Sequence, residues 1–141
     1  EQANNCINQF NYSSSSNSAY YAFFKVVLND MLINPEDWVL AFNGNTCVGS
    51  FQWDISNCNN DVCAVVAYGY DAFTSSLTQG YCESGDVPTF KIYDSSEGKI
   101  YDTHIKNLSG EIIVAALWGN LSMNVSDSLI AIPETDMDCN D

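Results

Sequence analysis

The stretch from Asp37 to Cys63 constrains the fold more than any other part of the chain. It holds two runs rich in β-branched and aromatic residues, 38–42 and 46–53, which the turn residues Asn43 and Gly44 join. An Asn-Gly pair between two such runs predicts a β-hairpin with a type I′ turn. Three of the six cysteines lie in the same stretch. It therefore predicts a hairpin that disulfides fasten.

Strand-forming segments fill much of the remaining chain. Turn signals recur about every ten residues, the spacing typical of an antiparallel sandwich or barrel. These strand segments are residues 19–29, 62–70, 89–93, 99–105, 110–118 and 121–125, and a short helix is possible at 71–77. We therefore predict an all-β fold, an antiparallel β-sandwich with disulfides, as a single domain over residues 1–141. The Asn/Ser-rich segment 1–18 and the acidic tail 133–141 are expected to be extended.

The six cysteines indicate an oxidising compartment, because 141 residues bury a sufficient core without disulfides. Structural zinc is the alternative. Zinc sites use close cysteine pairs or cysteine with histidine, and His104 is the only histidine of the chain. The spacing leaves many pairings open. We expect disulfides between Cys6 and Cys139, between Cys47 and Cys82, and between Cys58 and Cys63.

The charge of the chain excludes several classes of partner. It carries 18 acidic residues against four lysines and no arginine, for a net charge of −14. Nucleic acid and anionic membrane surfaces both require basic side chains, so neither is an expected partner. No apolar run has the length of a membrane span, and no signal-peptide pattern begins the chain. We expect an extracellular or cell-surface protein, not inserted in a membrane, whose signal peptide has been removed.

Four Asn-X-Ser sequons are consistent with secretion, since N-glycosylation acceptors lie at the surface of secreted proteins. Their asparagines are Asn11, Asn107, Asn120 and Asn124. The alternative is a set of unused sequons in an asparagine-rich bacterial protein.

Calcium is the candidate ion, because two acidic segments offer the oxygen ligands that it takes. Asp54 and Asp61 belong to the small cysteine loop, and Asp136 and Asp138 belong to the tail. Neither segment completes an EF-hand pattern, so solvated loop acids are the alternative. Trp53, beside the first loop, is the candidate for an exposed aromatic side chain that stacks on a sugar. The alternative for the aromatic residues is the core.

The sequence contains no recognisable catalytic arrangement, and we expect no enzyme. Nucleophilic hydrolysis needs a nucleophile, a base and a group that orients the base. His104 lies beside Asp102, but no G-x-S-x-G motif accompanies them. No pair of carboxylates stands out for glycoside hydrolysis.

One sequence pattern extends over much of the chain. It consists of the run WVLAFNGNTCVG from Trp38 to Gly49, the tripeptide QWD at 52–54, and then Cys58 and Cys63. The pattern continues in GDVPTFKIYD at 85–94. It resembles a module of long secreted or surface proteins, notably in marine bacteria, over roughly residues 20–103. The resemblance implies an extracellular β-rich adhesion or structural domain and supplies no catalytic residues.

These observations predict an extracellular structural or adhesive module, a subunit of a surface filament or matrix. Its expected partners are further copies of itself, other matrix proteins or glycans. The N-terminal segment is suited to lie as an added strand on the open edge of a neighbour. The alternative is a calcium- or carbohydrate-binding module. Size measurement and calcium-dependent melting would distinguish the two.

Overall fold

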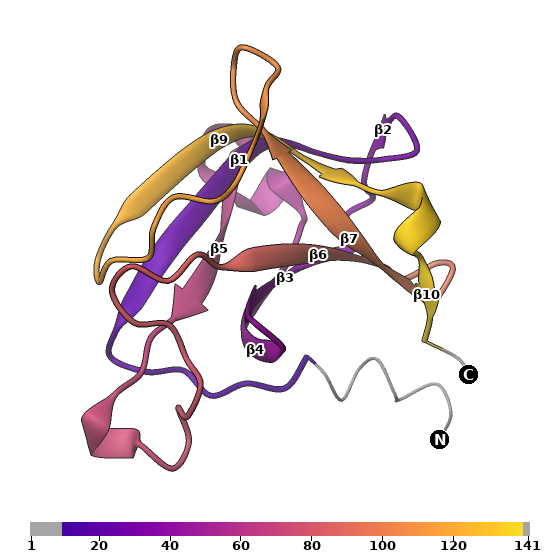
Figure 1. Cartoon of the computed structure of the whole chain (residues 1–141). Helices are drawn as coiled ribbons and strands as arrows, with labels where there is room; N and C mark the ends of the chain where they lie inside the picture. Colours follow the sequence, from indigo (N-terminus) through magenta and orange to yellow (C-terminus); the bar gives the residue numbers. More distant parts are fainter. Residues whose placement is uncertain (1–9, 140–141) are drawn as a thin grey trace.

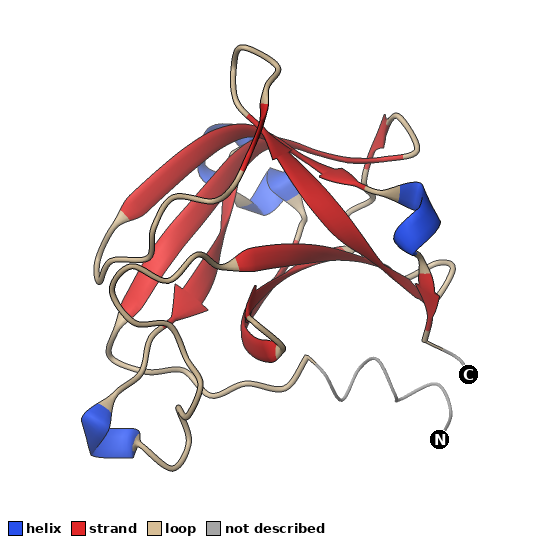
Figure 2. Cartoon of the chain, viewed as in Figure 1, coloured by secondary structure: helices blue, strands red, loops and turns tan. Residues whose placement is uncertain are grey.

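The computed structural model describes residues 10–139, which form an all-β fold (Figure 1, Figure 2). The strands belong to one mixed sheet that curls into a half-barrel, so the all-β prediction is confirmed and the sandwich is not. Among the described residues the longer elements are all strands, and the helices are single 3₁₀ turns.

Most of the longer strands lie close to predicted segments, whereas β2, β10 and residues 126–131 of β9 were not predicted. They are β1 (Ser18–Leu28), β2 (Met31–Leu32), β3 (Trp38–Asn43), β4 (Thr46–Gln52), β5 (Cys63–Tyr68), β6 (Thr89–Asp94), β7 (Lys99–Lys106), β8 (Ile112–Ile113), β9 (Met123–Ala131) and β10 (Met137–Asp138). The 3₁₀ turns are η1 (Ile55–Asn57), η2 (Asn59–Asp61), η3 (Ala72–Thr74) and η4 (Pro133–Thr135). Of the predicted strand 110–118 only β8 forms, the predicted strand 121–125 corresponds to the longer β9, and the possible helix at 71–77 is reduced to η3.

The order of strands in the sheet is β2-β1-β9-β7-β6-β3-β4, with β5 on β1 and with β8 and β10 on β7. One pair departs from the antiparallel expectation. β1 and β9 run parallel, with Tyr20 opposite Met123 and Val27 opposite Ile130. The two strands lie far apart in the sequence, and turn signals report only on neighbouring strands. Local patterns therefore could not predict this pairing.

The predicted hairpin is present as β3 and β4, which pair antiparallel. Asn43 still belongs to β3 and pairs with Thr46, so the turn residues are Gly44 and Asn45. Only Gly44 of the two has a positive φ, 60°, so the predicted type I′ turn at Asn43 and Gly44, which needs a positive φ at both turn residues, is wrong. The positive φ suits glycine because a side chain would be strained there. Both faces of β3 are buried, from Val39 to Phe42. The second predicted hairpin is also present, as β6 and β7.

Apolar side chains form two clusters on opposite faces of β3. The inner face contributes Val39 and Ala41 to the main core, which fills the half-barrel with aromatic and aliphatic side chains from most strands. The outer face contributes Leu40 and Phe42 to a smaller cluster. That cluster also contains Cys47, Ile100 and Cys139, and Phe10 packs against it.

The two-cluster arrangement explains which predicted disulfides form. Cys58 and Cys63 are bonded, as predicted. The predicted bond between Cys47 and Cys82 is wrong, because both are free, buried thiols. Cys47 belongs to the outer cluster and Cys82 to the main core, and side chains on opposite faces of a sheet cannot reach each other. Cys139 is disulfide-bonded, and Cys6, its predicted partner, lies outside the described residues.

Candidate assembly surface

The N-terminal half of β9 has an open edge. β9 pairs with β1 from Met123 onward, but it pairs with β7 only between Ser128 and Ala131. Among the described residues, 123–127 therefore have a ladder neighbour on one side only. Alternate residues of such an edge point their backbone N–H and C=O groups away from the sheet, where another strand can pair with them.

The open edge belongs to an uncharged part of a strongly acidic chain. Residues 112–126 contain no charged side chain, although the net charge of the protein is −14. Leu121 is 78% exposed and Val125 is 54% exposed. Four more exposed apolar residues accompany them: Ile112, Val114, Leu117 and Met123. We call these six side chains and the edge of β9 the β9 face. Val114, Met123 and Val125 line one groove, and exposed apolar side chains that lie together mark interaction sites.

The segment after β8 is held at a fixed place beside β9. Figure 1 shows it running along β9 before the chain turns back into that strand. The Tyr21 hydroxyl donates a hydrogen bond to the Ala116 carbonyl over 2.9 Å, and the Trp118 backbone N–H donates to the Asp86 carbonyl over 2.7 Å. Between this segment and β9 lies a groove of about 370 Å³, lined by residues 113–116 and 123–126 with β1 behind. These hydrogen bonds therefore fix the shape of the β9 face, which has a groove along the open strand.

The Tyr21 hydroxyl that holds this segment also resists ionisation. Burial, and then the neighbouring Cys82 thiolate, raise the pKa of Tyr21 from 10.0 to about 12. Burial, and then the Asp86 carboxylate, raise the pKa of Cys82 from 9.0 to about 12. Both groups therefore hold their protons more tightly in the folded chain than in the unfolded chain.

Alkaline pH is expected to destabilise the fold for this reason. The stabilisation from the protonated Tyr21 and Cys82 is fully present below about pH 9 and is lost as the pH rises toward about 12. Denaturant titrations at several pH values above 8 measure the effect. Tyr21→Phe keeps the ring but cannot ionise, so its free energy of unfolding should fall less steeply above pH 10. Equal slopes for the two proteins would contradict the assignment to Tyr21.

Three of the four sequons border the β9 face. The Asn120 side chain is exposed at its end, and its Oδ1 accepts a hydrogen bond from the Ser18 backbone N–H. Asn124 lies on β9, and its amide donates to the Tyr20 carbonyl. Asn107 lies in the turn before β8, where its amide donates to Glu111, and Asn11 is exposed elsewhere. Whether any of them carries a glycan stays a prediction.

The structure does not support Trp53 as an exposed platform for a sugar. The side chain is 3% exposed, and its ring centroid lies 5.9 Å from that of Phe51 and 6.3 Å from that of Phe23. The prediction was wrong because Trp53 follows β4 directly and turns into the core of the half-barrel. Its nearness in sequence to the polar loop therefore does not expose it.

The predicted calcium ligands are not brought together. Asp54 caps η1, where its carboxylate accepts hydrogen bonds from the Ser56 backbone N–H, the Ser56 hydroxyl and the Asn57 amide. Asp136 pairs with Lys99 over 3.1 Å. Asp61 is exposed in η2, and Asp138 is exposed in β10. Among residues 10–139 no group of three or more acidic, cysteine or histidine side chains is placed to hold a metal ion. Calcium binding stays a prediction.

The two residues considered for catalysis do not interact in the way that a catalytic pair requires. Asp102 pairs with Lys91 over 2.9 Å, and His104 is exposed on β7 beside a shallow pocket. That the protein is no enzyme stays a prediction. Within the described part of the chain, no helix has the length and apolar character of a membrane span.

Sequence reasoning missed the β9 face because it assigned residues 110–118 to a regular strand. The absence of charge over residues 112–126 was a usable signal, since a solvated surface of this acidic chain should carry carboxylates. No protein-family model, curated protein or solved structure matches the chain.

Proposed function

We propose that this protein is an extracellular structural or adhesive module that associates with copies of itself through the β9 face, as a subunit of a surface filament or matrix. The observation that carries the proposal is an open strand edge beside exposed apolar side chains, on an uncharged part of an acidic chain. The Cys58–Cys63 disulfide supports the extracellular location, because such bonds persist in oxidising compartments.

A second copy is the partner that this surface fits best. Two β9 edges can pair antiparallel about a two-fold axis at Val125, with Met123 of one copy opposite Asp127 of the other. Two chains that each carry a net charge of −14 repel each other over most of their surface. They can approach most closely where the charge is lowest, which is at the β9 face: over residues 112–127 Asp127 is the one charged residue, and it pairs with Lys25 of its own copy over 3.8 Å.

Charge repulsion also sets the expected salt dependence. The Debye length falls from about 10 Å at 0.1 M salt to about 3 Å at 1 M. Added salt therefore screens the repulsion between two acidic copies and leaves the apolar contact intact. Association should strengthen as the salt concentration rises, whereas a contact that depends on ion pairs would weaken.

Val125→Asp tests the proposal. It places a carboxylate at the centre of the β9 edge, so self-association should weaken by at least about tenfold in Kd. Sedimentation velocity or light scattering over a concentration series measures the change. Met137→Asp is the matched control, because it also replaces an exposed apolar residue with aspartate, away from the β9 face. It should associate as the unmodified protein does.

Two results would overturn the proposal. One is a strictly monomeric unmodified protein at high concentration and high salt. The other is Val125→Asp and Met137→Asp proteins that associate equally well. A monomer that melts at a higher temperature when calcium is added would favour the binding-module alternative.

A further inference from the structure

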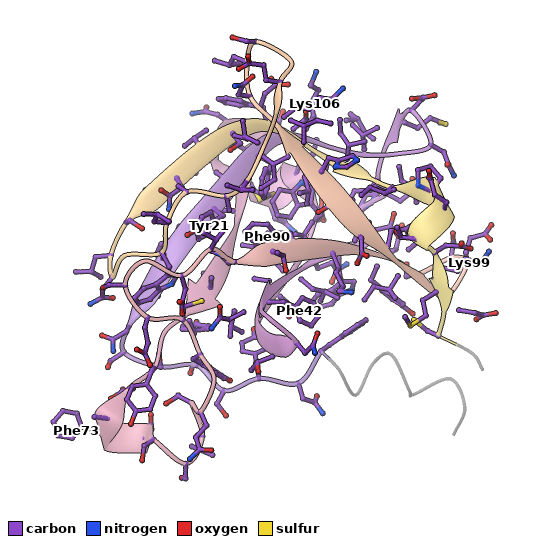
Figure 3. All side chains as sticks on the ribbon, viewed as in Figure 1. Tyr21, Phe42, Phe73, Phe90, Lys99 and Lys106 are labelled. Carbon is purple, nitrogen blue, oxygen red and sulfur yellow. A yellow bond between two sulfur atoms is a disulfide. The ribbon has the colours of Figure 1, made fainter. Side chains whose placement is uncertain are left out.

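A fully exposed aromatic side chain stands at one end of the molecule. Phe73 lies in η3, is 99% exposed and points away from the body of the protein at the lower left of Figure 3. Tyr70 and Leu77 of the same loop are exposed as well. Residues 72–82 carry no charge, and Phe73 and Leu77 are exposed there among serine, threonine and glutamine residues; we call this end of the molecule the knob.

The loop that presents Phe73 is braced from within. The carboxylate of the buried Asp71 accepts hydrogen bonds from the Ser16 hydroxyl over 2.7 Å and from the Phe73 backbone N–H over 3.0 Å. These bonds, led by that from Ser16, hold the pKa of Asp71 below its usual value. The Thr78 hydroxyl bonds to both the N–H and the carbonyl of Asp71. A knob ordered in advance loses little conformational entropy when it binds.

An apolar pocket lies at the opposite end of β1. It has a volume of about 170 Å³, and its walls include Phe24, Leu32, Pro35, Trp53 and Ile55. Leu32 is 58% exposed at its rim. Lys25, which also lines the pocket, is the one charged residue there.

The knob and the pocket of one molecule cannot meet. The knob loop is attached to the N-terminal end of β1, where the Gly69 N–H donates to the Asn17 carbonyl over 2.8 Å. The pocket is formed at the C-terminal end of β1, next to β2. β1 has 11 residues. At about 3.3 Å per residue, the two features lie tens of ångströms apart.

We propose that Phe73 of one copy inserts into the β1 pocket of the next copy, so that copies join head to tail along the direction of β1. The inference rests on the proposed self-association and adds a second contact to it. A contact between two different surfaces of the same chain does not close on itself and produces an open chain of subunits. Charge favours a second copy as the occupant. Lys25 lies beside the pocket with its side chain 57% exposed, and its ammonium group is 3.8 Å from the Asp127 carboxylate of the same copy. Glu83 and Asp86 follow the knob loop and carry the opposite charge, and a lysine can also contact the face of an aromatic ring.

Two single variants and their mixture test the contact. Phe73→Ala removes the knob and keeps the pocket, while Leu32→Asp places a charge at the pocket and keeps the knob. Both are made in the Val125→Asp protein, in which association through the β9 face is weakened. Each variant alone should be monomeric under conditions in which the Val125→Asp protein forms chains. An equimolar mixture should form 1:1 complexes and nothing larger, because only one knob and one pocket remain. Met137→Ala in the same background is the control and should still form chains.

The results separate this contact from the β9 face. If the Val125→Asp protein forms chains and the mixture forms 1:1 complexes, the head-to-tail contact is supported. It is overturned if the Val125→Asp protein is monomeric, or if Phe73→Ala associates as well as Met137→Ala. The β9 face fails by a different result, namely equal association of the Val125→Asp and unmodified proteins. Far-UV circular dichroism verifies that each variant is folded.

Discussion

Replacing Gly49 with alanine is expected to destabilise the fold by about 3 kcal/mol or more. Gly49 lies on β4, where the half-barrel brings β4 against β5. A Cβ atom at this position would lie 1.7 Å from the Val66 carbonyl oxygen and 2.9 Å from its carbonyl carbon. These are backbone atoms, so no side-chain rotation relieves the clash. Strands β4 and β5 would have to separate, which opens the main core between them.

Equilibrium unfolding in urea or guanidinium chloride measures this loss. Gly119→Ala is the matched control, because a Cβ atom there meets no atom within 4 Å. Its free energy of unfolding should stay within about 0.5 kcal/mol of that of the unmodified protein. If Gly49→Ala were as stable as Gly119→Ala, the approach of β4 to β5 would be wrong.

Truncating Trp118 to alanine is expected to cost about 3–5 kcal/mol of stability. The side chain is 5% exposed, and its Nε1–H donates to the Ala67 carbonyl over 2.8 Å. Its ring lies against Gly69, where an added Cβ atom would come within 2.4 Å of the ring. The residue therefore attaches the segment after β8 to β5. Its loss should disturb the β9 face together with the core.

Leu117→Ala is the comparison for this variant. The neighbouring Leu117 is exposed, so its truncation should change the free energy of unfolding by no more than about 0.5 kcal/mol. Trp118→Phe keeps an aromatic ring and loses the hydrogen bond to Ala67, so it should lie between the two. If Trp118→Ala unfolds at the same denaturant concentration as Leu117→Ala, the ring does not hold the segment.

The open edge of β9 and the Phe73 knob depend on different structural features. The edge needs a strand that its own sheet leaves half unpaired, which follows from the short overlap between β7 and β9. The knob needs a loop rigid enough to hold an apolar side chain in water, and the buried Asp71 and Thr78 meet that need. Both are separate from the core, so they can be altered without unfolding the protein.

Much of the strand content followed from local patterns. Three features involve neighbours in sequence: the β3–β4 hairpin around Gly44, the hairpin of residues 89–93 and 99–105, and the close pair Cys58 and Cys63. Their geometry depends on short-range sterics. β1 illustrates where this reasoning ends. Ala19, Tyr21 and Phe23 are buried at alternate positions, but Ala22 and Val26 are buried as well, so simple alternation does not describe the whole strand.

The candidate surfaces depended far more on packing. Trp53 looked exposed beside a polar loop and is buried. The segment 110–118 is predicted as a strand, but only β8 forms in it and most of its side chains are exposed. In both cases the position of the segment relative to the curled sheet decides which side chains are exposed. Whether a residue is buried depends on strands that lie far from it in the sequence, and its sequence neighbours do not show which strands these are.

The amino-acid sequence alone was sufficient for the all-β class, the two hairpins and the Cys58–Cys63 bond, because turn chemistry and alternation act over a few residues. Only the tertiary structure revealed the parallel pairing of β1 with β9, the placement of Cys47 and Cys82 on opposite faces of β3, and the open edge beside an uncharged segment. Each of these depends on contacts between segments that lie far apart in the sequence. Such contacts are decided by how the whole sheet curls around one core.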